Sequence, residues 1–187
     1  MKKPVMIITC GLTGTGKSTI INAVAERTGF PVLTSDRIRK ELVGIKPEER
    51  RYEAFDSGIY SKEFTQKTYS TMVEKGKERL MQGESVILDA CFSKEEQRRM
   101  ARKAAEEAGA GFLCVEFTAP EDEVKNRLDR RVENGGGVSD GRWEIYLGQK
   151  DSFERIDEFD DGEYLLIDTA EAKEKCVRKI LDELESN

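Results

Sequence analysis

The sequence predicts an α/β fold of three layers, in which a parallel sheet of five strands has helices on both faces. Two observations predict it. Short apolar segments alternate along the chain with longer segments of helical period. The apolar segments are continuous rather than alternating, which is typical of strands buried on both faces of a parallel sheet. The 187 residues suit one domain, residues 1–187, which is large enough to bury a full core.

The expected elements can be placed in order along the chain. Strand patterns lie at residues 5–10, 30–35, 85–90, 111–117 and 164–168. Helical patterns lie at residues 20–28, 36–42, 61–82, 93–108, 120–134, 140–155 and 170–184. Glycines such as Gly29 and Gly83 end helices. We expect Ser35 or Asp36 to be a helix N-cap, and Ser93 to open another helix with the capping-box spacing Ser-x-x-Glu.

The stretch Gly11–Thr19 joins the first expected strand to the first expected helix and has the spacing G-x-x-x-x-G-K-[ST]. Glycines let the backbone wrap closely around phosphates, so that N–H groups and the positive end of the helix face the anion. Lys17 is expected to reach the outer phosphates, and the Ser18 hydroxyl to coordinate Mg²⁺. The expected nucleotide-binding residues of this loop are Gly11, Thr13, Gly14, Thr15, Gly16, Lys17, Ser18 and Thr19.

The composition argues against several classes of protein. The net charge is −6, so a protein that binds nucleic acid through bulk positive charge is not expected. No apolar run reaches membrane-spanning length, and the first apolar run ends in the glycine-rich loop rather than in a signal-peptide cleavage site. The four cysteines form no C-x-x-C pair and are expected to be buried thiols in a reducing compartment. These features predict a cytoplasmic protein without membrane association.

The chain contains no histidine. This excludes Ser-His-Asp and Cys-His catalysis, and it moves any general-base role to a carboxylate. Ligands of parallel α/β sheets bind at the carboxyl ends of the strands, and Asp36 and Arg39 follow the second expected strand on one side of a helical turn. We expect Asp36 to be the base toward an acceptor hydroxyl and Arg39 to clamp an anionic group of the acceptor. The alternative role for Asp36 is that of a helix N-cap, and the alternative for Arg39 is a solvent-facing position on the helix.

Asp89 closes the third expected strand. An acid after such an apolar run is typical of the carboxylate that holds Mg²⁺, usually through water. The next residue is Ala90, whereas motor-type ATPases generally have a water-activating glutamate there, so transfer to a bound acceptor is favoured over hydrolysis. The alternative role for Asp89 is to cap the following turn.

Three arginines, Arg127, Arg130 and Arg131, share one face of the helix expected before the glycine run 135–137. We expect a small helical lid at approximately residues 124–145, whose arginines close over the transferring phosphoryl group. Arg142, which lies beyond the glycine run, is a weaker candidate for a lid arginine. The alternative for such a basic run is a solvated helix face. The segment 46–60 interleaves basic and aromatic residues, which suit either stacking on a nucleotide-like acceptor or packing of the loop onto the body.

Several of these segments together resemble a known family. They are the glycine-rich loop, the segments Ser35–Leu42 and Val86–Phe92, and the arginine face. They resemble the P-loop kinases related to polynucleotide 5′-hydroxyl kinase, and they are similar to the AAA-type predicted small kinases, over roughly residues 5–153. The resemblance implies a P-loop NTPase fold of the nucleoside-monophosphate-kinase type.

The same resemblance implies roles for single residues: phosphate and Mg²⁺ binding for Lys17 and Ser18, the base for Asp36, an acceptor anion for Arg39, and the catalytic lid arginine for Arg130. Arg127 and Arg131 are then further nucleotide-binding candidates. Zeta toxins and adenylylsulfate, gluconate and shikimate kinases share the scaffold with different acceptors, so the acceptor stays open.

The sequence therefore predicts an ATP- and Mg²⁺-dependent kinase that transfers the γ-phosphoryl group to a hydroxyl of a small molecule, a nucleotide or a polynucleotide end. The acidic net charge favours a small molecule. ATP is expected rather than GTP because no Asn-Lys-x-Asp guanine motif is present. The alternatives are an ATP-binding switch and a hydrolysing ATPase. The sequence indicates no particular protein partner.

Overall fold

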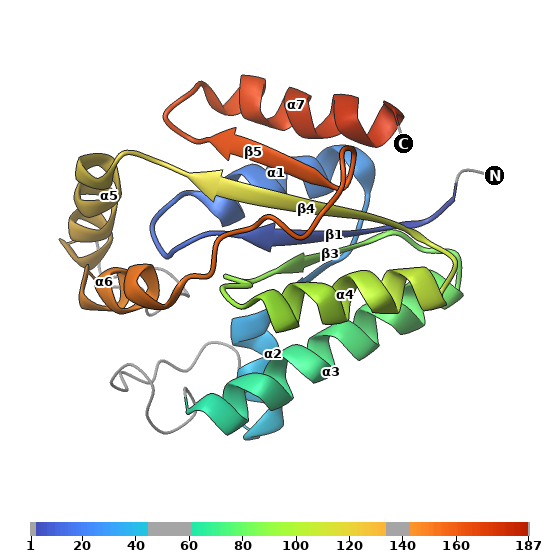
Figure 1. Cartoon of the computed structure of the whole chain (residues 1–187). Coiled ribbons are helices and arrows are strands. Elements are labelled where there is room, and N and C mark those ends of the chain that lie inside the picture. Colours follow the sequence, from blue (N-terminus) through green and yellow to red (C-terminus); the bar gives the residue numbers. More distant parts are fainter. Residues whose placement is uncertain (1–2, 45–60, 134–142, 187) are drawn as a thin grey trace.

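Within the described residues, 3–44, 61–133 and 143–186, the computed structural model contains a fully parallel sheet of five strands, as the sequence predicts (Figure 1). The strands are β1 (Val5–Cys10), β2 (Val32–Thr34), β3 (Val86–Asp89), β4 (Gly111–Thr118) and β5 (Tyr164–Asp168). Their order in the sheet is β2-β3-β1-β4-β5. The central strand is therefore β1, and the carboxyl ends of all these strands lie at one edge.

Helices cover both faces of the sheet, which confirms the predicted three layers. In the described parts of the chain they are α1 (Lys17–Thr28), α2 (Ser35–Leu42), α3 (Lys62–Met81), α4 (Glu95–Glu107), α5 (Glu121–Glu133), α6 (Trp143–Ser152) and α7 (Lys173–Ser186). Helices α1 and α7 lie on one face, and α3 and α4 lie on the other (Figure 1). None of these described helices is long and apolar enough to cross a membrane.

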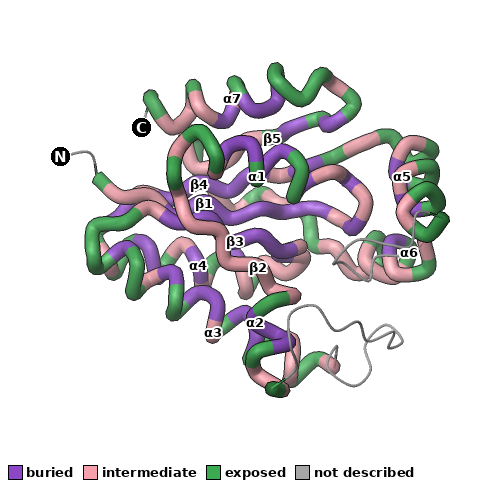
Figure 2. Tube along the Cα trace, turned by 180° about the vertical axis from the view of Figure 1, so that it is seen from behind, coloured by how far each residue is buried: buried purple, intermediate pink, exposed green. Residues whose placement is uncertain are grey.

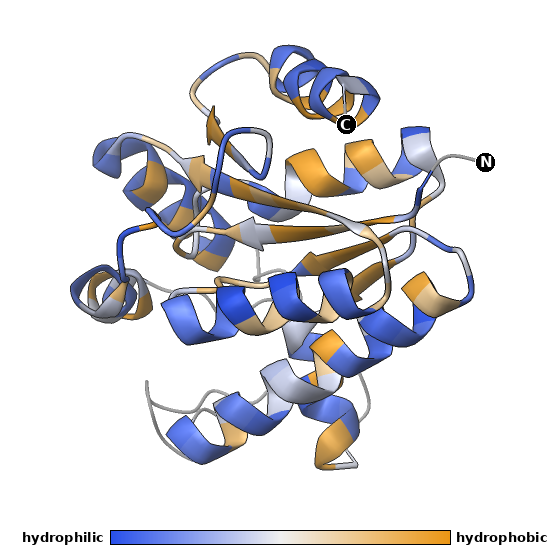
Figure 3. Ribbon diagram, turned by 45° about the vertical axis from the view of Figure 1, so that its right-hand side comes forward, coloured by the Kyte–Doolittle hydropathy of each residue, from blue (hydrophilic) through white to orange (hydrophobic). Residues whose placement is uncertain are grey.

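The alternation of side chains along β1 explains why this strand lies in the centre. Met6 and Ile8 pack in the core beneath α3 and α4, whereas Ile7 packs in the core beneath α1 and α7. All three side chains are fully buried, and burial of such an apolar side chain contributes about 1.5–3 kcal/mol. Figure 2 shows the buried strands between helices whose outer faces are exposed. Figure 3 shows that the strands are largely hydrophobic and that the outer faces of the helices are largely hydrophilic.

Helices α5 and α6 lie beyond the carboxyl edge of the sheet (Figure 1). They have a small apolar cluster of their own, formed by Val124 and Leu128 of α5 and Tyr146 of α6, with Trp143 packed against it. Trp143 also stacks on Tyr146, with ring centroids 4.9 Å apart. This pair of helices is therefore held at the edge where the predicted phosphate loop emerges.

Several expected boundaries are wrong by a few residues because neighbouring polar residues compete for the caps. The N-cap of α2 is Thr34, whose hydroxyl accepts a hydrogen bond from Arg37 N–H at 3.3 Å, rather than Ser35 or Asp36. The N-cap of α4 is Lys94 rather than Ser93, and Gln97 Oε1 accepts its N–H at 3.4 Å. Helix α6 ends at Ser152, before the expected residue 155, and α7 begins at Lys173 rather than at residue 170.

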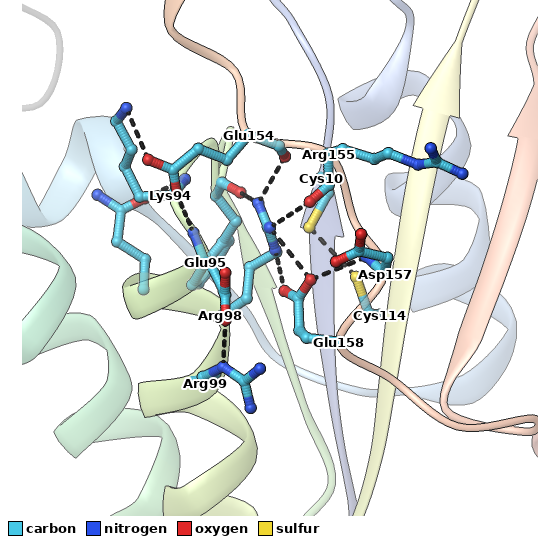
Figure 4. A network of polar contacts seen from close by, with 12 residues as sticks. Cys10, Lys94, Glu95, Arg98, Arg99, Cys114, Glu154, Arg155, Asp157 and Glu158 are labelled. Carbon is cyan, nitrogen blue, oxygen red and sulfur yellow. Dashed lines mark hydrogen bonds and ion pairs between the residues drawn. The ribbon is translucent and has the colours of Figure 1, made fainter.

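A buried ion pair attaches the segment after α6 to helix α4. Arg98 and Glu158 are paired, with side chains only 0% and 1% exposed. The Arg98 guanidinium also donates to three backbone carbonyls, those of Phe92 at 3.0 Å, Glu154 at 3.2 Å and Arg155 at 3.1 Å. Figure 4 shows the guanidinium surrounded by these acceptors. The irregular segment 153–158 is thereby fixed against α4 by polar contacts.

Candidate active site

The loop between β1 and α1 needs glycine at particular positions. Gly11 and Gly16 have φ of 127° and 88°, values that favour glycine. At Gly11 a Cβ atom would lie 2.4 Å from the carbonyl oxygen of Phe117, so a larger residue would collide with the backbone of β4. Gly16 is the N-cap of α1, and no side chain caps this helix. The first N–H groups of α1 are therefore available to an anion.

Lys17 is the first residue of α1 and is largely buried, at 9% exposure. Its ammonium group donates hydrogen bonds to the loop's own carbonyls, to Gly11 O at 2.8 Å and to Leu12 O at 2.7 Å. A positive charge is thus held directly over the start of the loop.

Ser18 and Asp89, the two residues expected to hold Mg²⁺, are hydrogen-bonded to each other in the structure. Ser18 Oγ donates to Asp89 Oδ2 at 2.8 Å, and Thr9 Oγ1 donates to Asp89 Oδ1 at 3.0 Å. The Thr9 hydroxyl also accepts the N–H of Ala90 at 3.0 Å, which fixes the end of β3 against β1. The Asp89 carboxylate is therefore oriented toward the loop and helix α1.

Asp36 and Arg39 lie on α2, beside the end of β3. Thr34 pairs with Asp89 in the sheet register, so Asp36 comes two residues beyond that point. Asp36 is not the N-cap, because Thr34 has that role. Arg39 is only 6% exposed, which rules out the alternative of a solvent-facing arginine. Neither an N-cap role for Asp36 nor a solvent-facing position for Arg39 therefore accounts for this pair.

Cys91 lies directly beside the phosphate loop, because Gly11 N–H donates to Cys91 O at 3.1 Å. Burial raises the pKa of its thiol. The positive charges of Lys17 and Arg39 oppose this rise in pKa, whereas the negative charges of Asp36 and Asp89 add to it. Since Cys91 follows Asp89 by two residues and Thr34 pairs with Asp89 in the sheet, the phosphate loop, Asp89 and the start of α2 lie at the same edge of the sheet.

Arg127 is connected to the phosphate loop through Thr169. Its guanidinium donates to Thr169 Oγ1 at 2.8 Å and to Thr169 O at 3.0 Å, and it is ion-paired with Glu123. Thr169, just after β5, donates to Thr15 O at 2.6 Å. Arg127 and Thr169 therefore link helix α5, the loop after β5 and the phosphate loop.

The other predicted lid residues are only partly described. Arg130 is exposed and Arg131 is half-buried near the end of α5. Arg142, the glycine run 135–137 and the segment 46–60 lie outside the described residues. The lid and the phosphoryl contact of Arg130 therefore stay predictions.

The structure adds residues that the sequence did not single out: Thr9, Gln149 and Thr169. Thr9 has a detectable signal, because it is the polar residue in an otherwise apolar strand. Gln149 Oε1 accepts the N–H of Thr13 at 2.8 Å, across a separation of 136 residues. Neither Gln149 nor Thr169 has a local pattern that reveals such a contact.

The arrangement defines a P-loop NTPase fold. A glycine-rich loop follows the central strand, its lysine and serine begin the next helix, and an acidic residue ends the neighbouring strand. A family model described as AAA domain matches residues 6–156, and the chain belongs to this family, AAA_33.

The chain has similar proteins in mycobacteria. An uncharacterized protein of Mycobacterium tuberculosis (strain ATCC 25618 / H37Rv) is 31% identical over 167 residues, which are 89% of this chain and 32% of that protein. The chain thus spans about a third of the length of the mycobacterial relatives that it matches.

Two solved structures show the same fold over nearly the whole chain. A gluconokinase from Sinorhizobium meliloti 1021 matches with a TM-score of 0.66 at 22% identity, over 100% of this chain and 94% of that one. The Mycobacterium tuberculosis APS kinase CysC, in complex with AMPPNP and APS, matches with a TM-score of 0.70 at 19% identity, over 99% of both chains. Kinases of small metabolites are therefore among the structural neighbours of this nucleotide-binding fold.

Proposed function

We propose that the chain is an ATP- and Mg²⁺-dependent kinase that transfers the γ-phosphoryl group to a hydroxyl of a small molecule. The observation that supports this best is the position of Asp36 and the buried Arg39 on α2, which begins beside Asp89, the hydrogen-bond partner of Ser18. A site that only binds or hydrolyses a nucleotide has no need of an Asp–Arg pair beside the loop. The net charge of −6 favours a small acceptor over a polynucleotide end.

Ser18 and Asp89 fit a magnesium ion that is shared with a triphosphate. Their oxygens, a hydroxyl and a carboxylate, are the hard ligands that Mg²⁺ prefers. No group of three or more His, Cys, Asp or Glu among the described residues could hold a metal by itself, which suits an ion that takes its remaining ligands from phosphate and water. Bound there, Mg²⁺ would supply positive charge to the phosphate oxygens.

The residues of the chain would divide the remaining work. Lys17, whose ammonium lies beside the loop carbonyls, would neutralise the outer phosphates, and Asp36 would accept the proton of the attacking hydroxyl. Arg39, held in a buried position, would orient the acceptor through an anionic group. Arg130, with Arg127 and Arg131, would supply positive charge from the lid side, residues 124–145.

The test of this function is a binding and transfer experiment in two steps. Calorimetry should show that the protein binds an unreactive ATP analogue and that Mg²⁺ strengthens this binding. Incubation with labelled ATP and a panel of hydroxyl-bearing metabolites and 5′-hydroxyl oligonucleotides should then give a phosphorylated product, with a small molecule as the expected acceptor. Nucleotide binding without any product favours the switch, and phosphate release without an acceptor favours the hydrolase. Either outcome contradicts the proposal.

Removal of the Ser18 hydroxyl is expected to uncouple nucleotide binding from Mg²⁺. Ser18→Ala should weaken the affinity for Mg²⁺ with the analogue by roughly 10- to 100-fold, the usual effect of losing a group that supports a metal site. Asp89 keeps its contact with Thr9, so the fold should persist. The internal control is binding in the presence of a chelator, where the variant and the wild type should agree. If Ser18→Ala shows the wild-type response to Mg²⁺, Ser18 has no role in holding the ion.

A further inference from the structure

The side chain of Gln149 connects helix α6 to the phosphate loop. The N–H of Thr13 donates to Gln149 Oε1 at 2.8 Å. The carbonyl of the same peptide unit, that of Leu12, accepts a hydrogen bond from Lys17 Nζ at 2.7 Å. A trans peptide carries its N–H and C=O on opposite edges, so Gln149 and Lys17 hold the two edges of one peptide.

This peptide lies at the outer-phosphate end of the loop. The lysine of such loops reaches the outer phosphates of the nucleotide, and the ammonium of Lys17 lies beside Leu12 O. The amide of Gln149 therefore approaches the same end of the loop from the side of α6.

The amide group of Gln149 retains unused donors. A glutamine side chain has one acceptor oxygen and an NH₂ group with two donors, and a backbone N–H can only donate, so the oxygen must face Thr13. Among the residues that the structure describes, none accepts a hydrogen bond from the Gln149 nitrogen. Within the described chain, this nitrogen is not one of the buried side-chain atoms without a partner, so it is accessible from solvent. It therefore faces space that a ligand can enter.

Helix α6 is fixed on both sides of Gln149. One turn earlier, Tyr146 is buried in the apolar cluster shared with α5. Close to the end of the helix, Lys94 Nζ donates to Ser152 O at 2.9 Å. Between α6 and the end of β4 lies a cavity of about 590 Å³ that Leu12 also lines. Leu12 of the loop packs against the apolar cluster, and the hydrogen bond from Thr13 N–H to Gln149 Oε1 adds a direct polar contact between the loop and α6.

We propose that Gln149 is a nucleotide-binding residue that recognises the outermost phosphate. Its carbonyl oxygen holds the N–H of Thr13, and its amide nitrogen donates to an oxygen of the terminal phosphoryl group. An amide can do both, whereas a carboxylate would repel the phosphate, and the cation of a lysine or an arginine cannot accept an N–H. The inference rests on the proposed kinase function and adds to it a residue of α6 that distinguishes ATP from ADP.

The test compares two nucleotides in two variants. Calorimetry is carried out with an ATP analogue that has an unreactive β–γ bridge and, separately, with ADP. Gln149→Ala should weaken binding of the analogue by roughly 10- to 100-fold, as expected for a hydrogen bond to a charged group, and binding of ADP much less. Gln149→Glu retains an acceptor for Thr13 but replaces the donors by a negative charge, so it should discriminate against the analogue at least as strongly.

The matched control is Leu147→Gln, a change at a position of the same helix that is 42% exposed, which should bind both nucleotides like the wild type. If both Gln149 variants keep the wild-type ratio of analogue to ADP affinity, Gln149 is only a structural tie and the proposal is wrong. Tighter analogue binding would also overturn it, because the Gln149 oxygen would then compete with phosphate. Should Gln149→Ala fail to fold in thermal denaturation, Gln149→Glu alone decides. A wild-type protein that binds neither nucleotide refutes the proposed function itself, before any variant is made.

Discussion

Replacing Asp36 by asparagine is expected to lower the rate of phosphoryl transfer about 10²- to 10⁴-fold, the usual contribution of a general base. The affinity for an unreactive ATP analogue should stay nearly unchanged, because Asp36 would contact the acceptor and not the triphosphate. Two structural facts support this role. Thr34 already caps α2, so Asp36 does not have that structural role, and Asp36 lies two residues beyond the Thr34–Asp89 pair, at the strand end that contacts Ser18. The rate is measured with the acceptor that the panel identifies.

The control for this substitution is Glu41→Gln on the same helix. Glu41 is exposed and pairs with Arg37 and Lys75 at the surface, and such pairs contribute only about 0–1 kcal/mol. Glu41→Gln should therefore transfer phosphate like the wild type. A wild-type rate in Asp36→Asn would remove Asp36 as the base. A loss of analogue affinity equal to the loss of rate would instead show that Asp36 supports the nucleotide site.

The fold could be predicted from the sequence because its signals are local and repeated. Each strand is a short apolar run, and each run is followed by a helical pattern, so a parallel sheet with helices on both faces follows. The neighbourhood of Asp36 and Asp89 could also be foreseen, since the carboxyl ends of parallel strands meet at one edge. In the structure, Thr34 pairs with Asp89, which brings Asp36, two residues after Thr34, close to the end of β3. The functional roles of both residues remain predictions.

What could not be foreseen depends on contacts between distant segments. In the sequence, Arg98 is followed by Arg99 on a charged helix and suggests surface charge, yet its partner Glu158 lies 60 residues away in an irregular segment. The contact of Gln149 with Thr13 likewise has no periodicity that would reveal it. Helix boundaries were misplaced where two polar residues stand together, as at Thr34 and Ser35, because either hydroxyl suits an N-cap.

Substitution of Glu158 by glutamine is expected to lower the free energy of unfolding by about 3–5 kcal/mol, the cost of leaving one partner of a buried ion pair behind. The Arg98 side chain is fully buried, and its carbonyl partners do not neutralise its charge. Urea unfolding at neutral pH measures the effect. The matched control is Glu154→Gln in the same segment, where the pair with Lys94 is about half exposed, with side-chain exposures of 47% and 44%. Glutamine can keep the hydrogen bond that Glu154 accepts from Glu95 N–H at 2.7 Å, so that change should cost about 0–1 kcal/mol.

The same pair predicts how stability depends on pH. Burial is the largest single influence and raises the pKa of Glu158, but the hydrogen bond and charge of Arg98 and the backbone N–H groups of Asp157 and Glu158 together outweigh it and hold the pKa below the usual value of 4.5. A carboxylate with a lowered pKa in the folded state stabilises the fold fully above its unfolded value. This stabilisation is lost as the pH falls below 4.5 and through the folded-state pKa, because the unfolded chain binds the proton first. The difference in unfolding free energy between wild type and Glu158→Gln should therefore shrink on acidification.

Loss of the Arg98–Glu158 ion pair is also expected to affect the candidate site, because residues 153–158 follow α6 directly and attach it to α4. The Arg98 guanidinium bonds to the carbonyls of Glu154 and Arg155, directly after the helix that carries Gln149. A weaker anchor should therefore reduce binding of the ATP analogue more than binding of ADP, at temperatures where the Glu158→Gln variant is still folded. A variant with normal stability at neutral pH would show that the carbonyls alone satisfy Arg98. A destabilised variant with an unchanged analogue-to-ADP ratio would show that α6 is held by its contacts with α5 instead.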